Sequence, residues 1–378
     1  MNKELITKLI RIFTAGICFS SIIPILGMGI REAQQFIWML GITAIFALIM
    51  RNIWVTLFLG WTVFLYSFFK FQSGLIYLTN IFYSCLFYYL IKLAFRKEHI
   101  DFYIKIVLWF VFANIILVAL QIIGFDFIYT IQNLQLGKYV LSESILPTGF
   151  MGAIAFMGCL MSLAMPLLAS RRSKWAIVGA FGLFLPLYLS KAMLCFLGAI
   201  IGLLFVLFFR FKRAVWIGLI IVLLIGAIFY VKYEFFEIAR FKMWKKVLQY
   251  CVIHPITGWG LDSFRNFTPF KDFNFMNSFR TDGQNQEIIT MNIWDNPHNL
   301  YVSLFFEFGI VGLFLLGGYL RQLCIWFRKA IKDPNVIGLA GFVLVFFINS
   351  FGHFIIFLPR FAVFVIPAFA LFEVAIRE

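Results

Sequence analysis

One histidine stands where it could act chemically. His298 follows Pro297 and precedes Asn299, directly before an apolar run that begins at Leu300. The proline would fix the approach of the chain, and the asparagine could cap the helix or orient the imidazole. Because an imidazole ordinarily titrates near neutral pH, a histidine at the outer mouth of a membrane helix is suited to act as a general base. The alternative is an interfacial histidine that only satisfies local hydrogen bonds.

A basic amphipathic helix is predicted from about 235 to 251, upstream of this histidine. Phe241, Trp244, Leu248 and Cys251 recur at helical spacing, while the lysines fall mostly elsewhere. Such a helix suits a membrane interface. Either it only lies on the bilayer surface, or its cations hold a lipid-linked phosphate. For the second role Arg240 is the best candidate, because a guanidinium can bind phosphate through two parallel hydrogen bonds.

Two pairs of glycines flank the histidine in sequence. Gly258 and Gly260 follow Pro255, and this pattern predicts a tight turn. The backbone of the turn could approach a ligand, or the turn could have a structural role only. Gly309 and Gly312 lie three residues apart in the apolar run, and this spacing predicts a small-residue face on which another helix packs closely. Neither pair belongs to a phosphate-binding P-loop or a dinucleotide fingerprint.

The composition identifies the kind of molecule that must position these residues. Of 378 residues, 63% are hydrophobic and 13% charged, whereas soluble domains carry about 25% charged residues. This excludes a soluble enzyme, and the 51 phenylalanines argue against disorder. Unbroken apolar runs favour an all-α polytopic integral membrane protein over a β-barrel. The six cysteines are scattered without a CxxC pair and indicate neither a disulfide framework nor zinc.

About twelve apolar runs are long enough to be transmembrane helices. Their approximate limits are 12–30, 34–50, 53–69, 73–95, 104–123, 148–169, 175–190, 192–209, 214–231, 300–320, 335–352 and 359–376. The chain accordingly divides into spans one to nine (1–231), one large outer loop with the amphipathic helix (232–298) and spans ten to twelve (299–378).

The basic residues predict the topology. With the N-terminus in the cytoplasm, the inner loops hold 19 Lys and Arg and the short outer loops hold 5. This bias predicts cytoplasmic N- and C-termini and places the long loop outside. The net charge of +15 therefore reports topology, and no nucleic-acid partner is expected.

The motif His298-Asn299, nine residues, Gly309, two residues, Gly312 resembles the signature of the bacterial O-antigen ligases and related polysaccharide polymerases. The turn at 255–261 and the plan of about twelve spans with one large outer loop are similar to that family as well. Many members show a Ser-Arg pair at the outer end of a middle span, where the arginine contacts a diphosphate. Here the pair is Ser190-Lys191, which keeps the charge and loses the guanidinium fork.

The resemblance implies a glycosyltransferase of the bacterial inner membrane with a periplasmic active site. Such an enzyme moves a glycan from undecaprenyl diphosphate to a hydroxyl of an acceptor sugar, either lipid A core or a growing glycan. His298 would be the base. Arg240, with Lys191, Arg265 and Arg360 as weaker candidates, would stabilise the departing diphosphate. Lys191 and Arg360 could instead be interfacial anchors. Membrane lipids would surround the spans, and no metal or other cofactor is expected.

Several alternatives remain open at this point. A ligase attaches finished polymer to lipid A core, a polymerase joins repeat units on the carrier, and a third relative glycosylates protein hydroxyls. The complete motif spacing favours the ligase. A glycolipid transporter or flippase is the alternative from another class. It is disfavoured because Glu307 and Glu373 are the only acidic residues clearly inside predicted spans, and neither is central.

Overall fold

The computed structural model describes residues 53–69, 74–123, 154–171, 173–190, 192–210, 238–266, 297–352 and 359–378. These residues form helices joined by turns and short connections, which confirms the predicted all-α class for them. The elements are α3 (Ile53–Phe69), α4 (Gly74–Ala94), the 3-10 turn η2 (Lys97–His99), α5 (Ile100–Ile122), α7 (Ile154–Ala169), α8 (Lys174–Gly182), α9 (Phe184–Leu189), α10 (Met193–Arg210), α12 (Ile238–Cys251), α13 (Ser263–Asn266), α15 (Leu300–Ala330), α16 (Ile337–Asn349) and α17 (Pro359–Arg377).

Two stretches of described helix are long and apolar enough to cross a bilayer, Lys97–Ile122 and Leu300–Ala330. Shorter apolar helices accompany them at Phe156–Ala169, Trp175–Leu189, Leu194–Arg210 and Ile337–Asn349. The predicted spans 12–30, 34–50 and 214–231 lie outside the described residues, so the total of twelve stays a prediction.

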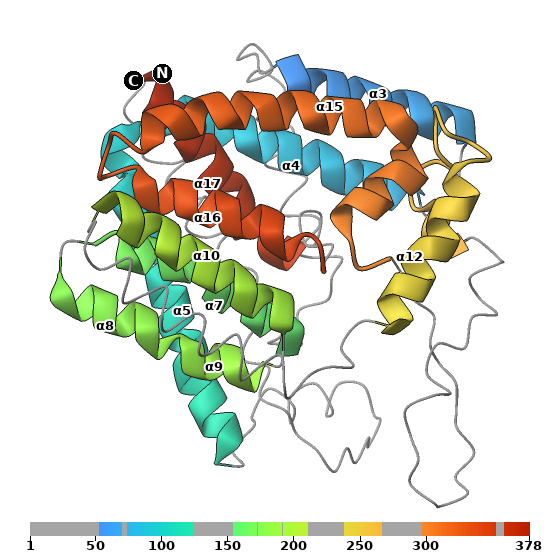
Figure 1. The fold of residues 1–378 in the computed structure, drawn as a ribbon. Helices are drawn as coiled ribbons and strands as arrows, with labels where there is room; N and C mark the ends of the chain where they lie inside the picture. Colours follow the sequence, from blue (N-terminus) through green and yellow to red (C-terminus); the bar gives the residue numbers. More distant parts are fainter. Residues whose placement is uncertain are drawn as a thin grey trace, which may run out of the picture.

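The core of the bundle is built from α7, α10 and α16, which pack against one another (Figure 1). Small residues allow this close approach: a Cβ added at Gly341 of α16 would lie 2.6 Å from the Cβ of Pro166 in α7. One buried polar bond links the same helices, because Asn349 Nδ2 donates to Ser162 Oγ at 2.7 Å. These contacts fix the end of α16, which the candidate site uses.

Charged residues that the sequence assigns to the cytoplasmic side meet at one end of the bundle. Arg171 Nη1 lies 2.6 Å from Asp101 Oδ1, and Lys97 Nζ lies 2.6 Å from Asp333 Oδ2, just beyond the end of α15. His298 lies at the other end of α15. The cation-rich connections and the histidine thus lie at opposite ends of α15.

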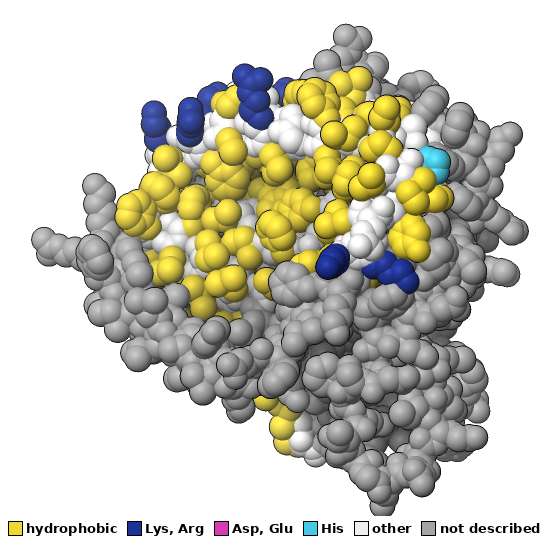
Figure 2. Space-filling view, turned by 45° about the vertical axis from the view of Figure 1, so that its right-hand side comes forward, with side chains coloured by type: hydrophobic (Ala, Val, Ile, Leu, Met, Phe, Trp, Pro, Cys, Tyr) yellow, Lys and Arg dark blue, Asp and Glu magenta, His cyan; other side chains and the backbone are white. Residues whose placement is uncertain are grey.

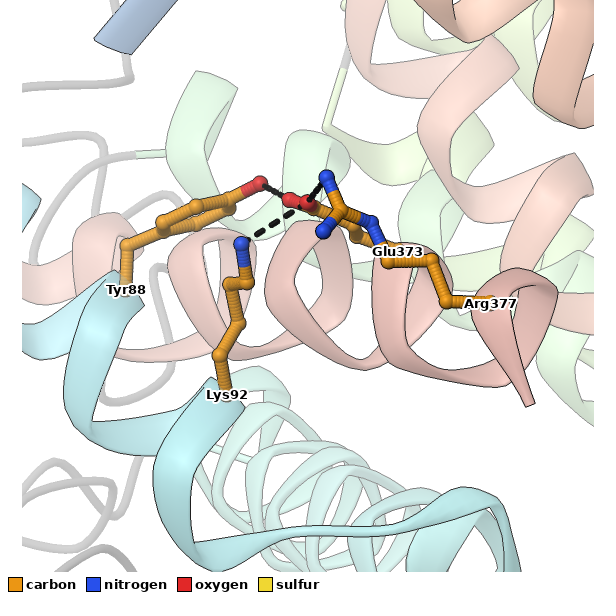
Figure 3. Close-up of polar contacts among 4 residues, drawn as sticks. All are labelled: Tyr88, Lys92, Glu373 and Arg377. Carbon is orange, nitrogen blue, oxygen red and sulfur yellow. Dashed lines mark hydrogen bonds and ion pairs between the residues drawn. The ribbon is translucent and has the colours of Figure 1, made fainter. Parts of the chain in front are cut away.

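Figure 3 shows how the buried carboxylate of Glu373 joins α4 to α17. Glu373 is fully buried, and its Oε1 lies 2.7 Å from Lys92 Nζ and 2.5 Å from Arg377 Nη2. The hydroxyl of Tyr88 donates to its Oε2. Because two cations and a hydroxyl contact this carboxylate, it links α4 to α17 through buried polar contacts.

Two predicted spans differ from the observed helices. The predicted span 175–190 is divided into α8 and α9; Pro186 lies in the first turn of α9 and lacks the N–H that would continue the hydrogen-bond ladder. The predicted span 300–320 continues to Ala330, and its course changes at Gly309, which has φ 65° and ψ −164°. Residues 300–308 and 310–330 are therefore two helices that meet at a sharp bend (Figure 1).

Candidate active site

The amphipathic helix predicted at 235–251 is α12, and it lies across one end of the bundle (Figure 1). Its buried face agrees with the predicted one at Cys251 and, in part, at Trp244, and differs from it at Leu248. Met243, Val247 and Cys251 are buried against Phe306 of α15, whereas Leu248 is 43% exposed. Burial raises the pKa of the Cys251 thiol to about 12, so this cysteine packs as a neutral apolar group. The apolar face of α12 is thus taken up by protein.

His298 is presented by a backbone that its neighbours hold in place. Its φ of 50° lies in the left-handed region, which costs a residue other than glycine about 1–3 kcal/mol. On one side, Trp244 Nε1 of α12 donates to Pro297 O at 2.8 Å. On the other side, Leu300 N donates to Ser350 O, beyond α16, at 2.9 Å. The backbone that carries the half-buried His298 is therefore held between α12, α15 and the end of α16.

Asn299 uses both ends of its amide, as the sequence indicates for a cap. Its Oδ1 accepts hydrogen bonds from the N–H groups of Tyr301 and Val302, which caps α15. Its Nδ2 donates to Phe351 O at 3.0 Å. One side chain thus begins the helix and ties it to the segment after α16.

Replacing Asn299 separates these two roles. Asn299→Ala loses the cap and the bond to Phe351, each worth about 1 kcal/mol, so its melting temperature and its activity should both fall. Asn299→Ser keeps a capping oxygen and loses the donor to Phe351 without burying a charge, so it should melt between Asn299→Ala and wild type. Equal melting temperatures for all three proteins in detergent would contradict both roles.

The turn predicted at 255–261 docks into the bend of α15. The bend frees backbone groups of the helix, and the turn binds them: Trp259 N donates to Phe306 O at 2.8 Å, Gly260 N to Glu307 O at 3.1 Å, and Ile310 N to Pro255 O at 2.8 Å. The two glycine motifs are therefore two halves of one junction between the turn at 255–261 and α15.

Glycine is required where the two halves touch. Gly258 and Gly309 both have positive φ, and a Cβ on Gly309 would overlap the carbonyl group of Ile256 and lie 2.6 Å from Gly258 N. A Cβ on Gly312 would overlap the Cβ of Phe308, in the first part of the same helix. The prediction that Gly309 and Gly312 form a face for another helix is therefore wrong: they accommodate a turn and the bend itself.

Trp61 of α3 completes the junction, and sequence reasoning missed it. Its Nε1 donates to Phe308 O at 3.0 Å, which satisfies a third carbonyl at the bend. Trp61→Phe keeps most of the ring and removes the donor, so the unfolding free energy should fall by about 1–3 kcal/mol. Thermal unfolding in detergent measures this loss, and an unchanged melting temperature would show that the bond does not support the bend.

Glu307 is a second residue whose place the sequence did not indicate. It is buried, and its carboxyl group lies against the backbone of Asp262 and Phe264, with Tyr77 of α4 beside it. The available signal was a single acidic residue within an apolar run, two positions before Gly309. Its role here is to hold the end of the docked turn against α15.

The four candidate cations are placed only by their backbone or not at all. Arg240 lies in the first turn of α12, Arg265 in α13 and Arg360 in the first turn of α17, and their side chains are outside the described residues. Lys191 itself is not described; its neighbour Ser190 is buried, with its Oγ donating to Leu187 O. Both α12 and α13 pack against α15, which brings the stretches carrying Arg240 and Arg265 to the helix that His298 precedes.

An apolar cavity of about 150 Å³ lies next to the histidine segment, since Leu300 is one of the residues that line it. Leu300 and Leu304 of α15 line one end, and Phe346 and Phe347 of α16 lie beside them. Tyr88 and Tyr319 also line it. Among the described residues, no three His, Cys, Asp or Glu side chains are grouped as metal ligands would be.

Comparison with known families identifies the region that contains this junction. The model of one family, described as O-antigen ligase, matches residues 156–317. The match runs from α7 to the middle of α15 and includes His298, Asn299, Gly309 and Gly312. No curated protein matches the chain.

Proposed function

Because residues 156–317 belong to the O-antigen ligase family, we propose that this membrane protein transfers a glycan from undecaprenyl diphosphate to a sugar hydroxyl. The acceptor we propose first is lipid A core, at the outer face of the bacterial inner membrane. A polymerase of the same family, with a carrier-linked glycan as acceptor, is the second candidate.

The observation that carries the proposal is the presentation of His298. An otherwise unfavourable backbone conformation is held by hydrogen bonds on both sides, and such strain is typical of functional positions. In the proposed reaction the imidazole takes the proton of the acceptor hydroxyl. The oxygen then bonds to the anomeric carbon while the bond from that carbon to the diphosphate oxygen breaks, and the diphosphate leaves with the electron pair.

Cations must stabilise the charge that develops on the leaving diphosphate. Arg240 is the first proposal, and its register on α12 supports it. Residues four apart share a helix face, so position 240 lies one turn before Trp244 on the same face of α12, and the indole of Trp244 bonds to Pro297 O next to His298. Arg265, Lys191 and Arg360 are further proposals for the same charge.

The polyprenyl tail needs an apolar groove that reaches the reacting end. We assign this role to the cavity between α3, α4, α15, α16 and α17, because one of its lining residues, Leu300, lies two residues after His298. Its lining of leucine and phenylalanine suits isoprenoid units.

Deleting the gene in its host tests the proposal and separates the acceptors. Surface glycolipids and carrier-linked glycans are resolved by size, with the wild-type gene restored as control. Long polymer stranded on the carrier, with bare lipid A core, is the expected result. A single repeat unit on lipid A core would instead identify a polymerase. If neither pool changes, the transfer of O-antigen is refuted for that host.

A further inference from the structure

The outer turn carries a surface that the proposed reaction does not use. The buried face of α12 is occupied by α15, yet one stripe of the helix stays exposed. Lys245, Leu248 and Val252 follow one another at helical spacing along this stripe. Exposure is 43% for Leu248 and 73% for Val252, so the stripe changes from a cation to aliphatic side chains toward the end of α12.

The aliphatic surface continues into the turn that docks on α15. Ile253 is 58% exposed and Ile256 62%. Monomeric water-facing surfaces rarely gather large aliphatic side chains in one short segment, and such a patch usually marks a binding surface. The backbone of this segment is fixed rather than loose, because Pro255 O accepts the hydrogen bond from Ile310 N.

The docking also fixes where this patch lies relative to the spans. Ile310 and Phe314 begin the second part of α15, and they are 56% and 69% exposed. In a membrane helix such side chains face lipid. One face of the molecule is hydrophobic over most of its described area and carries Lys and Arg at two of its borders (Figure 2). The turn therefore adjoins the outer end of a lipid-facing surface.

We propose that residues 252–256 insert into the outer leaflet and contact its acyl chains. Lys245 then lies at the level of the lipid headgroups, where a lysine is favoured. The lipid contact and the hydrogen bonds at Gly309 hold the same turn, so the bilayer sets the depth of the outer loop above α15. The inference requires a membrane-spanning chain and does not depend on glycosyl transfer.

Spin-label accessibility in liposomes tests the insertion. Ile253→Cys is labelled with a nitroxide in a protein that also carries Cys324→Ser, since Cys324 is the exposed one of the free cysteines within the described residues. Relaxation by oxygen, which concentrates in acyl chains, is compared with relaxation by a water-soluble nickel chelate. Phe314→Cys serves as the lipid-facing reference, and Glu98→Cys, exposed in η2 at the charged end of the bundle, serves as the water-facing one.

The expected result is an oxygen-to-nickel accessibility ratio at Ile253 close to that at Phe314 and several-fold above that at Glu98. A ratio equal to that at Glu98 would place the turn in water and overturn the proposal. Low accessibility to both reagents would also overturn it, because protein would then cover the site. Neither result would affect the glycan profile of the deletion strain, so the two proposals fail separately.

Discussion

Gly309→Ala is expected to detach the outer turn from α15 and to abolish activity through loss of the site's shape. The conformation at φ 65° and ψ −164° is open essentially to glycine alone. Any other residue held in this conformation is destabilised by about 1–3 kcal/mol. The added Cβ also overlaps the carbonyl group of Ile256. Separation of the turn would remove three backbone hydrogen bonds worth about 1 kcal/mol each. The expected loss of stability is thus about 4–6 kcal/mol.

Gly317→Ala is the matched control on the same helix. A Cβ there meets nothing within 4 Å, and alanine favours a helix over glycine by about 1 kcal/mol. Thermal unfolding and limited proteolysis of residues 252–262 should therefore distinguish the two variants strongly. A Gly309→Ala protein that melts like Gly317→Ala, with its turn equally protected, would contradict the junction described for α15.

His298→Asn is expected to lower transfer by about 10²–10⁴-fold, the contribution typical of a positioned general base. Asparagine is the sharpest replacement because, unlike alanine, it tolerates the left-handed backbone found at this position. The variant thus removes the imidazole and keeps the bend of the chain. Transfer is measured as glycan on the acceptor at equal amounts of membrane-inserted protein.

His99→Ala controls for the loss of a histidine as such. His99 belongs to η2, at the opposite end of the bundle, and its Nδ1 accepts a hydrogen bond from Arg96 N. We expect this variant to transfer at the wild-type rate. If His298→Asn also kept that rate, His298 would be removed from the mechanism.

The sequence predicted single apolar helices well and the junctions between them poorly. The predicted spans 53–69 and 192–209 agree with α3 and α10 within one residue, because length and hydropathy suffice for a straight apolar helix. The bend of α15 could not be predicted. Gly309 is compatible with both close helix packing and positive φ, and only the docking of the turn at 255–260 distinguishes them.

In the candidate site, too, local features could be predicted from the sequence and contacts between distant segments could not. Motif spacing identified His298, Asn299 and the turn, since each is a local feature of the chain. Trp61 and Glu307 were not identified from the sequence, because their roles depend on contacts with residues distant in the chain. The face of α12 was misjudged for a related reason: Leu248 and Val247 are equally apolar, and packing on Phe306 selects Val247.

The most direct test of the account uses purified protein, a glycan linked to undecaprenyl diphosphate, and lipid A core or a second carrier-linked glycan as acceptor. Released undecaprenyl diphosphate and transferred glycan are counted together. We predict one carrier released for each glycan transferred by the wild-type protein, and both products lowered together by about 10²–10⁴-fold with His298→Asn. Release without transfer, or equal turnover by His298→Asn, would contradict the claim that His298 drives glycan transfer from the carrier.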